Sequence, residues 1–125
     1  MKTLLIVEDD ANQRLLYKKE LTKDNYRVLL ADGGRMAVKI AEKEDLDLVV
    51  LDIEMPGMDG IEALGRILDR KNTLPVIIHT AYPYYKDNFM SWAANAYIVK
   101  SSDLSELKSE IHEILSERSK AAALA

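Results

Sequence analysis

Polar side chains that could do chemistry stand directly behind four short apolar runs of this sequence. Two of these runs end in carboxylates, one ends in a hydroxyl and one ends in an ammonium group. In open parallel sheets, ligands bind outside the carboxyl ends of the strands, so groups in such positions meet at one rim. The residues concerned are Asp9 and Asp10, then Asp52, Thr80 and Lys100.

This set of groups poses a problem of charge, because carboxylates that lie close together cannot all stay ionised without a positive partner. Mg²⁺ is the natural partner, since it takes oxygen ligands from carboxylates, water and phosphate. Lys100 would add a second positive charge as a point donor. An aspartate beside a cation and a lysine can attack phosphorus, which makes Asp52 a candidate for an aspartyl phosphate. The plain alternative is that Asp52 only solvates the end of a strand.

Each of these groups needs a strand to carry it and a helix to follow that strand. Short apolar runs rich in β-branched residues are typical of strands buried on both faces. Five alternations of strand and helix predict an α/β fold with a parallel sheet and helices on both of its faces. The predicted strands are Leu4–Val7, Tyr26–Ala31, Leu48–Leu51, Val76–Ile78 and Tyr97–Val99, and the predicted helices are Ala11–Asp24, Arg35–Lys43, 61–68, Tyr84–Trp92 and 104–115.

The composition limits the kinds of protein that this chain can be. Its 125 residues are enough for one domain, and its net charge of -4 argues against nucleic-acid binding by this segment. It has no cysteine and hence no disulfide or cysteine-based metal site. No apolar run approaches the ~20 residues of a membrane span, and no signal-peptide core is present. We expect a cytoplasmic domain at 1–118, followed at 119–125 by a frayed helix end, a linker or a cloning remnant.

Four segments carry a specific pattern in their order and spacing: LLIVEDD at 4–10, LVVLDIEMPGMDGIE at 48–62, PVIIHTA at 75–81 and AYIVK at 96–100. Together they resemble a response-regulator receiver domain of bacterial two-component signalling. The resemblance implies a flavodoxin-like (βα)5 doubly wound fold, with a parallel five-stranded sheet in the order 2-1-3-4-5. It also implies a signalling domain rather than an enzyme, one that assists only its own phosphorylation and dephosphorylation.

The resemblance implies a role for each candidate residue. Asp52 would be the phosphoacceptor, and Lys100 would pair with the phosphoryl group. Thr80 would bind a phosphoryl oxygen and act as the switch, and the aromatic ring of Tyr97 would follow its movement. The Mg²⁺ ligands would be Asp9, Asp10, Asp52 and the backbone carbonyl of Glu54.

Some of these residues have a second interpretation. Asp10 is also a predicted N-cap of the first helix, a role compatible with metal binding, and Asp59 and Asp103 are predicted to cap later helices. Tyr97 is equally well explained as a packing residue. As a whole, the chain could be a pseudo-receiver that binds a partner without phosphorylation. A phosphohydrolase is a weaker alternative, and the absence of a Gly-Lys pair excludes a P-loop NTPase.

The implied partners are a sensor histidine kinase or a histidine phosphotransfer protein. An effector domain or a second copy of the chain could bind through the last helices and strand.

Three departures from the family pattern fall in the region of the last helices and strand. Ser101 replaces a proline that usually follows the lysine through a cis bond, Ala93 replaces a glycine, and the stretch 80–100 is about two residues short. Six of the eight aromatic residues lie there too, and Tyr82 and Tyr84 suggest a partner surface: Tyr82, Tyr84, Tyr85, Phe89, Trp92 and Tyr97.

Overall fold

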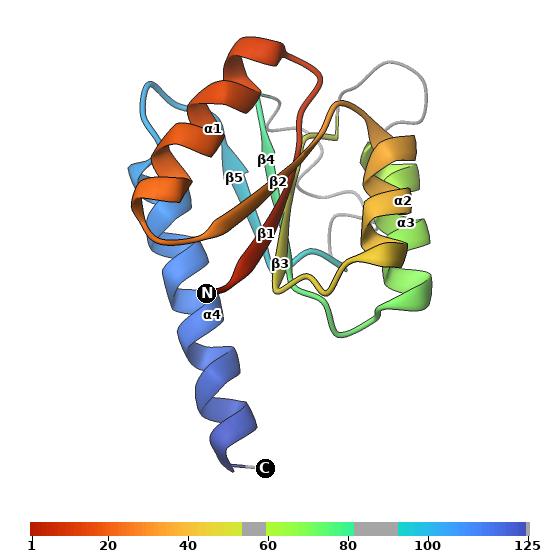
Figure 1. The fold of residues 1–125 in the computed structure, drawn as a ribbon, viewed down its shortest axis with the longest axis vertical. Helices are drawn as coiled ribbons and strands as arrows, with labels where there is room; N and C mark the ends of the chain where they lie inside the picture. The colour runs from red at the N-terminus through yellow and green to blue at the C-terminus, as the bar shows by residue number, and fades with distance from the viewer. Residues whose placement is uncertain (54–59, 82–92, 125) are drawn as a thin grey trace.

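A computed structural model of the chain describes residues 1–53, 60–81 and 93–124. Within these residues, strands and helices alternate along most of the chain (Figure 1). The strands are β1 (Thr3–Val7), β2 (Arg27–Ala31), β3 (Leu48–Leu51), β4 (Val76–Thr80) and β5 (Ala96–Val99). The helices are α1 (Ala11–Lys23), α2 (Gly34–Lys43), α3 (Gly60–Arg70) and α4 (Ser105–Leu124).

The five strands form one parallel sheet in the order β2-β1-β3-β4-β5, which confirms the predicted fold class and strand order. Val7 of β1 pairs with Ala31 of β2 on one side and with Leu51 of β3 on the other. The carboxyl ends of these strands therefore lie at one edge of the sheet. β1, β3 and β4 are buried along their whole length, as expected for a sheet that is covered on both faces.

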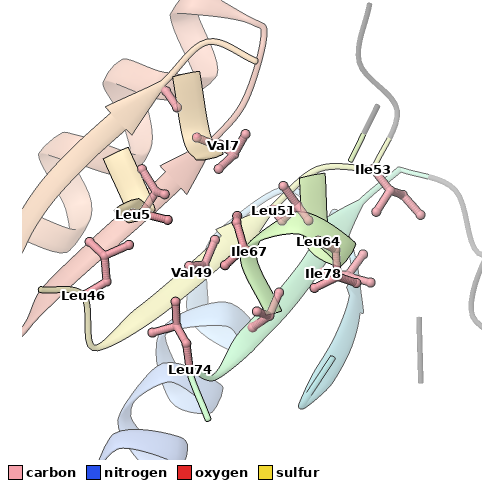
Figure 2. Close-up of a cluster of buried hydrophobic side chains, with 14 residues drawn as sticks. Leu5, Val7, Leu46, Val49, Leu51, Ile53, Leu64, Ile67, Leu74 and Ile78 are labelled. Carbon is pink, nitrogen blue, oxygen red and sulfur yellow. The ribbon is translucent and has the colours of Figure 1, made fainter. Parts of the chain in front are cut away.

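Helices cover both faces of the sheet, so the strands alternate their side chains between two apolar clusters. α2 and α3 lie on one face, where Val49 and Leu51 of β3 pack toward Leu64 and Ile67 of α3 (Figure 2). α1 and α4 lie on the other face, and the cluster there includes Tyr17 of α1. Fixing the sheet between two packed layers gives its carboxyl edge a rigid base.

The last helix is longer than predicted, because α4 continues to Leu124, whereas the prediction extended to residue 115. Figure 1 shows its second half running past the end of the sheet. Asp103 accepts a hydrogen bond from the backbone N–H of Ser105 at the start of this helix. Among the described residues, none of the helices combines the length and the apolar character that crossing a membrane requires.

Several expectations for the region between β3 and β5 fall on residues outside the described ranges. They are the cap at Asp59, the carbonyl of Glu54, the helix predicted at 84–92 and the aromatic residues from Tyr82 to Trp92. Two others can be compared with the structure. The bond between Lys100 and Ser101 is trans, and the backbone of Ala93 does not enter the left-handed region that a closing glycine often adopts.

Candidate functional site

The acidic side chains at the ends of β1 and β3 meet at the carboxyl edge of the sheet. Because Val7 lies opposite Leu51, the residues that follow the two strands are neighbours in space. Glu8, Asp9 and Asp52 each offer a carboxylate oxygen, and these oxygens all lie within 4.8 Å of one another. Glu8 and Asp52 are buried, whereas Asp9 is exposed. We call these three residues the acidic cluster.

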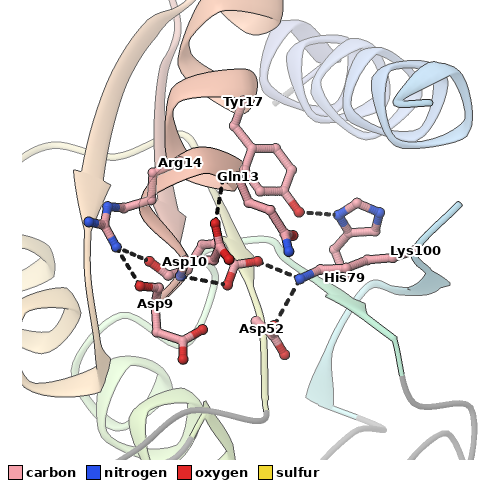
Figure 3. A network of polar contacts seen from close by, with 9 residues as sticks. Asp9, Asp10, Gln13, Arg14, Tyr17, Asp52, His79 and Lys100 are labelled. Atoms are coloured by element: carbon pink, nitrogen blue, oxygen red, sulfur yellow. Dashed lines mark hydrogen bonds and ion pairs between the residues drawn. The ribbon is translucent and has the colours of Figure 1, made fainter. Parts of the chain in front are cut away.

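Lys100 reaches this cluster from the end of β5. Its ammonium group forms an ion pair with Glu8 and lies 3.0 Å from Oδ2 of Asp52 (Figure 3). Burial by itself would lower the pKa of Lys100, but its hydrogen bonds to Glu8 and Asp52 and their negative charges outweigh burial and raise it. The lysine therefore stays charged and balances part of the negative charge of the cluster.

Glu8 belongs to the site although the sequence analysis did not assign it a role. Its side chain is 2% exposed, and its two oxygens accept hydrogen bonds from Lys100 and, at 3.3 Å, from the backbone N–H of Asp10. A signal for Glu8 was present in the sequence, because it stands directly after its apolar strand just as Asp52 does. Counting from the strand end would have selected Glu8 and Asp9.

Asp10 lies outside the acidic cluster. It is exposed, and its Oδ1 accepts a hydrogen bond of 3.0 Å from the backbone N–H of Gln13, which caps the start of α1. One turn into this helix, the guanidinium of Arg14 donates to the carbonyl oxygens of Glu8 and Asp9 at 2.9 Å each (Figure 3). The start of α1 thus fixes the backbone that carries the acidic cluster, and the structure gives Asp10, a predicted Mg²⁺ ligand, no place in that cluster.

Gly60 allows α3 to begin close behind Asp52. A Cβ atom at this position would lie 2.4 Å from the carbonyl oxygen of Asp52 and 2.3 Å from Cα of Ile53. No side chain fits in that space, because such distances fall well inside van der Waals contact. The backbone N–H of Gly60 also donates to the carbonyl of Ile53 at 3.2 Å. This close approach holds the end of β3 against the helix that follows.

The two predicted switch residues lie on neighbouring strands. Thr80 ends β4, is fully buried, and accepts a 2.7 Å hydrogen bond at its carbonyl oxygen from the backbone N–H of Lys100. Tyr97 pairs with Ile78 in the ladder between β4 and β5 and is partly buried against the cluster on the α2 and α3 face. The structure therefore ties Thr80 directly to Lys100, and the switching roles of both residues stay predictions.

A buried polar pair lies beside Lys100 that the sequence analysis did not anticipate. The hydroxyl of Tyr17 lies 2.6 Å from Nδ1 of His79, and the two rings are 5.7 Å apart in an edge-to-face arrangement (Figure 3). Burial and the nearby charge of Lys100 lower the pKa of His79 to about 4, although Asp52 opposes this. Burial and the charges of Glu8 and Asp52 raise the pKa of Tyr17. Both side chains are therefore neutral at neutral pH.

The low pKa of His79 predicts an acid-labile fold. An unfolded histidine binds a proton near pH 6.5, whereas the folded protein resists protonation of His79 until about pH 4. The stabilisation is thus complete above pH 6.5 and is lost as the pH falls through this window, by about 3 kcal/mol at most. Denaturant unfolding at several pH values measures the effect.

The His79→Leu variant is expected to show a flatter dependence of unfolding free energy on pH in that window. His112→Gln is the matched control, because the exposed His112 is hydrated in the folded and the unfolded chain alike. Equal slopes for wild type and His79→Leu would show that His79 is not held neutral by the fold.

The acidic cluster has the chemistry of a site for a hard cation. Three carboxylates supply oxygen atoms at mutual distances that one small ion can span, and one ammonium group balances only part of their charge. Both oxygens of Glu8 are already engaged by protein donors, so Asp9 and Asp52 are the better placed to hold Mg²⁺ directly. The residues present therefore fit this metal.

Comparison of the sequence with known proteins identifies the family of this chain. A family model described as the response regulator receiver domain matches residues 4–112. The response regulator ArlR of Staphylococcus epidermidis is 36% identical over 117 residues, which are 92% of this chain and 53% of that protein. The chain thus spans about half the length of this curated relative.

Solved structures show the same fold. The response regulator protein TrrA of Thermotoga maritima, in complex with Mg²⁺-BeF, has a TM-score of 0.87 and 42% identity and covers 90% of this chain and 98% of its own. TrrA in complex with the histidine kinase ThkA has a TM-score of 0.86 and 42% identity, covering 92% and 99%. A CheY-like receiver domain of Methanospirillum hungatei has a TM-score of 0.91 and 29% identity, covering 97% and 98%.

Proposed function

The chain belongs to the family of response regulator receiver domains, and on that premise we propose that Asp52 accepts a phosphoryl group from a histidine kinase or a histidine phosphotransfer protein. The observation that carries this proposal is the contact of Lys100 with Oδ2 of Asp52 at 3.0 Å, beside two further carboxylates. TrrA, a relative of this chain, is known in complex with a histidine kinase, which supports a partner of that class.

The proposed step is a displacement at phosphorus. A carboxylate oxygen of Asp52 forms a bond to the phosphorus atom, while the bond from phosphorus to the imidazole nitrogen of the donor breaks. The imidazole keeps the electron pair of that bond and takes up a proton. Lys100 stabilises the negative charge that the phosphoryl oxygens carry during this step. Asp52 and its neighbours assist only this transfer and the later dephosphorylation, in which water attacks the aspartyl phosphate and releases phosphate, so the domain is a signalling device.

Asp9, Asp52 and the carbonyl of Glu54 would hold Mg²⁺, and Glu8 takes the position in the cluster that the sequence analysis gave to Asp10. When bound, this ion neutralises phosphoryl oxygens and so favours attack by an anionic carboxylate. TrrA in complex with Mg²⁺-BeF supports the choice of metal.

Incubation with a small phosphodonor and Mg²⁺, followed by intact-mass measurement, tests the proposal. The mass is expected to rise by one phosphoryl unit, and removal of Mg²⁺ with a chelator is expected to prevent the rise. A mass that never changes would instead favour the pseudo-receiver interpretation, in which the domain only binds a partner.

Three variants separate the roles of the acidic residues. Asp9→Asn is expected to weaken Mg²⁺ binding about tenfold or more, because even groups outside the ligand shell are commonly worth about 10–100-fold in affinity. Glu8→Gln is expected to leave Mg²⁺ affinity nearly unchanged and to slow phosphorylation at saturating Mg²⁺ about tenfold, because Lys100 loses a charge-assisted bond. Asp10→Asn is the control, since asparagine caps helices as well as aspartate does.

Isothermal titration with Mg²⁺ measures the affinity of each variant, and intact mass followed over time measures its rate of phosphorylation. An equal loss of Mg²⁺ affinity in Glu8→Gln and Asp9→Asn would contradict this division of roles.

Phosphorylation would act on a partner through Thr80 and Tyr97. The phosphoryl group adds about -1.5 to -2 charges at neutral pH, which draws the hydroxyl of Thr80 toward it. Movement of Thr80 changes the space available to Tyr97 and so biases the surface formed by β5 and α4. An output domain or a second copy of the chain would read that surface in the cytoplasm of a bacterium.

A further inference from the structure

The Tyr17–His79 pair fixes the position of the proton on the histidine ring. The hydroxyl of Tyr17 and Nδ1 of His79 share one hydrogen bond, and its direction depends on the tautomer of the ring. Among the described residues, donation by the hydroxyl leaves one polar group of the pair without a partner, whereas donation by Nδ1–H leaves two, so we assign the hydroxyl as the donor. The proton of the ring is therefore on Nε2. Figure 3 shows the ring above the stem of Lys100, with its second nitrogen turned away from Tyr17.

Nε2 is a buried donor for which the described part of the chain supplies no acceptor. The side chain of His79 is 3% exposed, and within residues 1–53, 60–81 and 93–124 no group accepts a hydrogen bond from this nitrogen. Buried polar groups in folded proteins are nearly always paired, so an unpaired one indicates a water molecule or a ligand beside it. The pairing of Nδ1 with Tyr17 prevents the ring from turning to avoid this cost.

A pocket of about 240 Å³ has His79 in its lining. It opens between the first half of α1 and the segment that follows β5. Its walls are largely apolar, and Lys100 forms one side of it. The lining residues are Gln13, Leu16, Tyr17, His79, Lys100, Ser101 and Leu104. The lining of the pocket shares no residue with the acidic cluster, which contacts the ammonium group of Lys100.

The chemistry of the walls selects the occupant. Water beside Leu16 and Leu104 is poorly held and is displaced favourably by an apolar group. The positive charge of Lys100 is already balanced by Glu8 and Asp52, so an anion gains little there. A cation would be repelled by the positive charge of Lys100. A neutral body with one hydrogen-bond acceptor matches the pocket.

We propose that this pocket binds a small neutral ligand with an apolar body, whose single carbonyl oxygen accepts a hydrogen bond from Nε2 of His79. The site goes beyond the proposed phosphorylation of Asp52 and stands without it. Because Lys100 lines the pocket and also contacts Asp52, a bound ligand restricts the motion of the lysine that serves the phosphoryl site. Ligand binding and chemistry at Asp52 are then coupled through one side chain.

Nuclear magnetic resonance on the full ¹⁵N-labelled chain tests the site, with acetophenone as the probe. The ring nitrogens of His79 are expected to show a protonated Nε2 and an unprotonated Nδ1. Titration with acetophenone is expected to shift the backbone signals of Leu16, Ser101 and Leu104 and to saturate with a Kd of about 1–10 mM, as expected for so small a ligand. Ethylbenzene, which lacks the carbonyl, is expected to give smaller shifts at equal concentration.

Two variants isolate the hydrogen bond. His79→Leu is expected to weaken acetophenone binding about fivefold, the usual worth of one neutral hydrogen bond. Tyr17→Phe keeps the histidine ring but frees Nδ1, so the proton divides between the two nitrogens and binding weakens less. Tyr17→Phe and the ethylbenzene comparison decide the matter if His79→Leu does not fold.

Several results would overturn the inference: shifts that do not saturate, equal affinity in the wild type and the folded variants, or an absence of shifts because only water occupies the pocket. The binding measurement needs no phosphorylation. A chain that binds acetophenone but never gains mass would therefore contradict the proposed function and leave this site standing.

Discussion

The Asp52→Asn variant is expected to gain no mass at all when it is incubated with a small phosphodonor and Mg²⁺. An amide oxygen is neutral and a poor nucleophile toward phosphorus, so the loss should be complete within detection. The fold should survive, because asparagine has nearly the same shape and can still accept a hydrogen bond from Lys100, which lies 3.0 Å from Oδ2 in the wild type. Intact-mass spectra of the variant and the wild type under the same conditions measure the effect.

Asp10→Asn is the matched control for this experiment. It removes one carboxylate from the same edge of the sheet, but from a residue that caps α1 and lies outside the acidic cluster. It is expected to accept a phosphoryl group at close to the rate of the wild type. A phosphoryl unit that still appears on Asp52→Asn would place the acceptor elsewhere in the chain.

Lys100→Met is expected to produce the second-largest effect, and it acts on both rate and stability. Removal of a group that stabilises charge in a transition state commonly costs about a hundredfold in rate, and phosphorylation should slow by this order. The variant also leaves Glu8 and Asp52 buried without their cation, which costs about 3 kcal/mol of unfolding free energy at neutral pH. Methionine keeps the apolar length of the lysine stem, so packing changes little.

The stability cost of Lys100→Met has a defined dependence on pH. Burial raises the pKa of Glu8, and Lys100 opposes this rise. Without the lysine, the folded pKa of Glu8 lies further above its unfolded value, so this carboxyl favours folding while it is protonated and opposes folding as the pH rises. The difference from the wild type should therefore be smallest near pH 4 and should grow toward pH 7. Denaturant unfolding at these pH values measures it.

Lys108→Met is the control for the loss of charge. Lys108 forms ion pairs with Glu20 at 3.2 Å and Asp24 at 3.7 Å on the flank of α1, and its side chain is 28% exposed. Exposed and half-exposed pairs contribute about 0–1 kcal/mol, so this variant should be nearly as stable as the wild type. Equal effects of the two lysine variants on phosphorylation would show that Lys100 has no special role at Asp52.

Most of the fold could be predicted because local patterns agree with it. Apolar strands such as Leu48–Leu51 are too short and too rich in β-branched residues to be helices, and five strand–helix repeats leave few topologies. The rule that ligands bind beyond the carboxyl ends of parallel strands then selected Asp52 and Lys100 as neighbours, although 48 positions separate them. The order of the strands came from the family resemblance, since periodicity does not specify which strands pair.

The exact membership of the site depended on register, which the sequence does not display. Nothing in the sequence distinguishes the adjacent residues Asp9 and Asp10 as metal ligands. The pairing of Val7 with Leu51 turns Glu8 inward beside Asp52. Asp10 is left outside the acidic cluster and caps α1. A shift of one residue along a strand end changes the direction of the side chain, so it decides which carboxylate is buried. Tyr17 and His79 met only because α1 lies on the face of the sheet where β4 buries His79, and their hydrogen bond had no local signal in the chain.

The sequence by itself thus determined which groups could take part in phosphorus chemistry and which edge of the sheet would carry them. Tertiary structure decided which of those groups lie close enough to neutralise one another, since burial and distance set the strength of each electrostatic interaction. A structure in which Lys100 left Asp52 for another partner would remove the physical basis for phosphorylation at this residue.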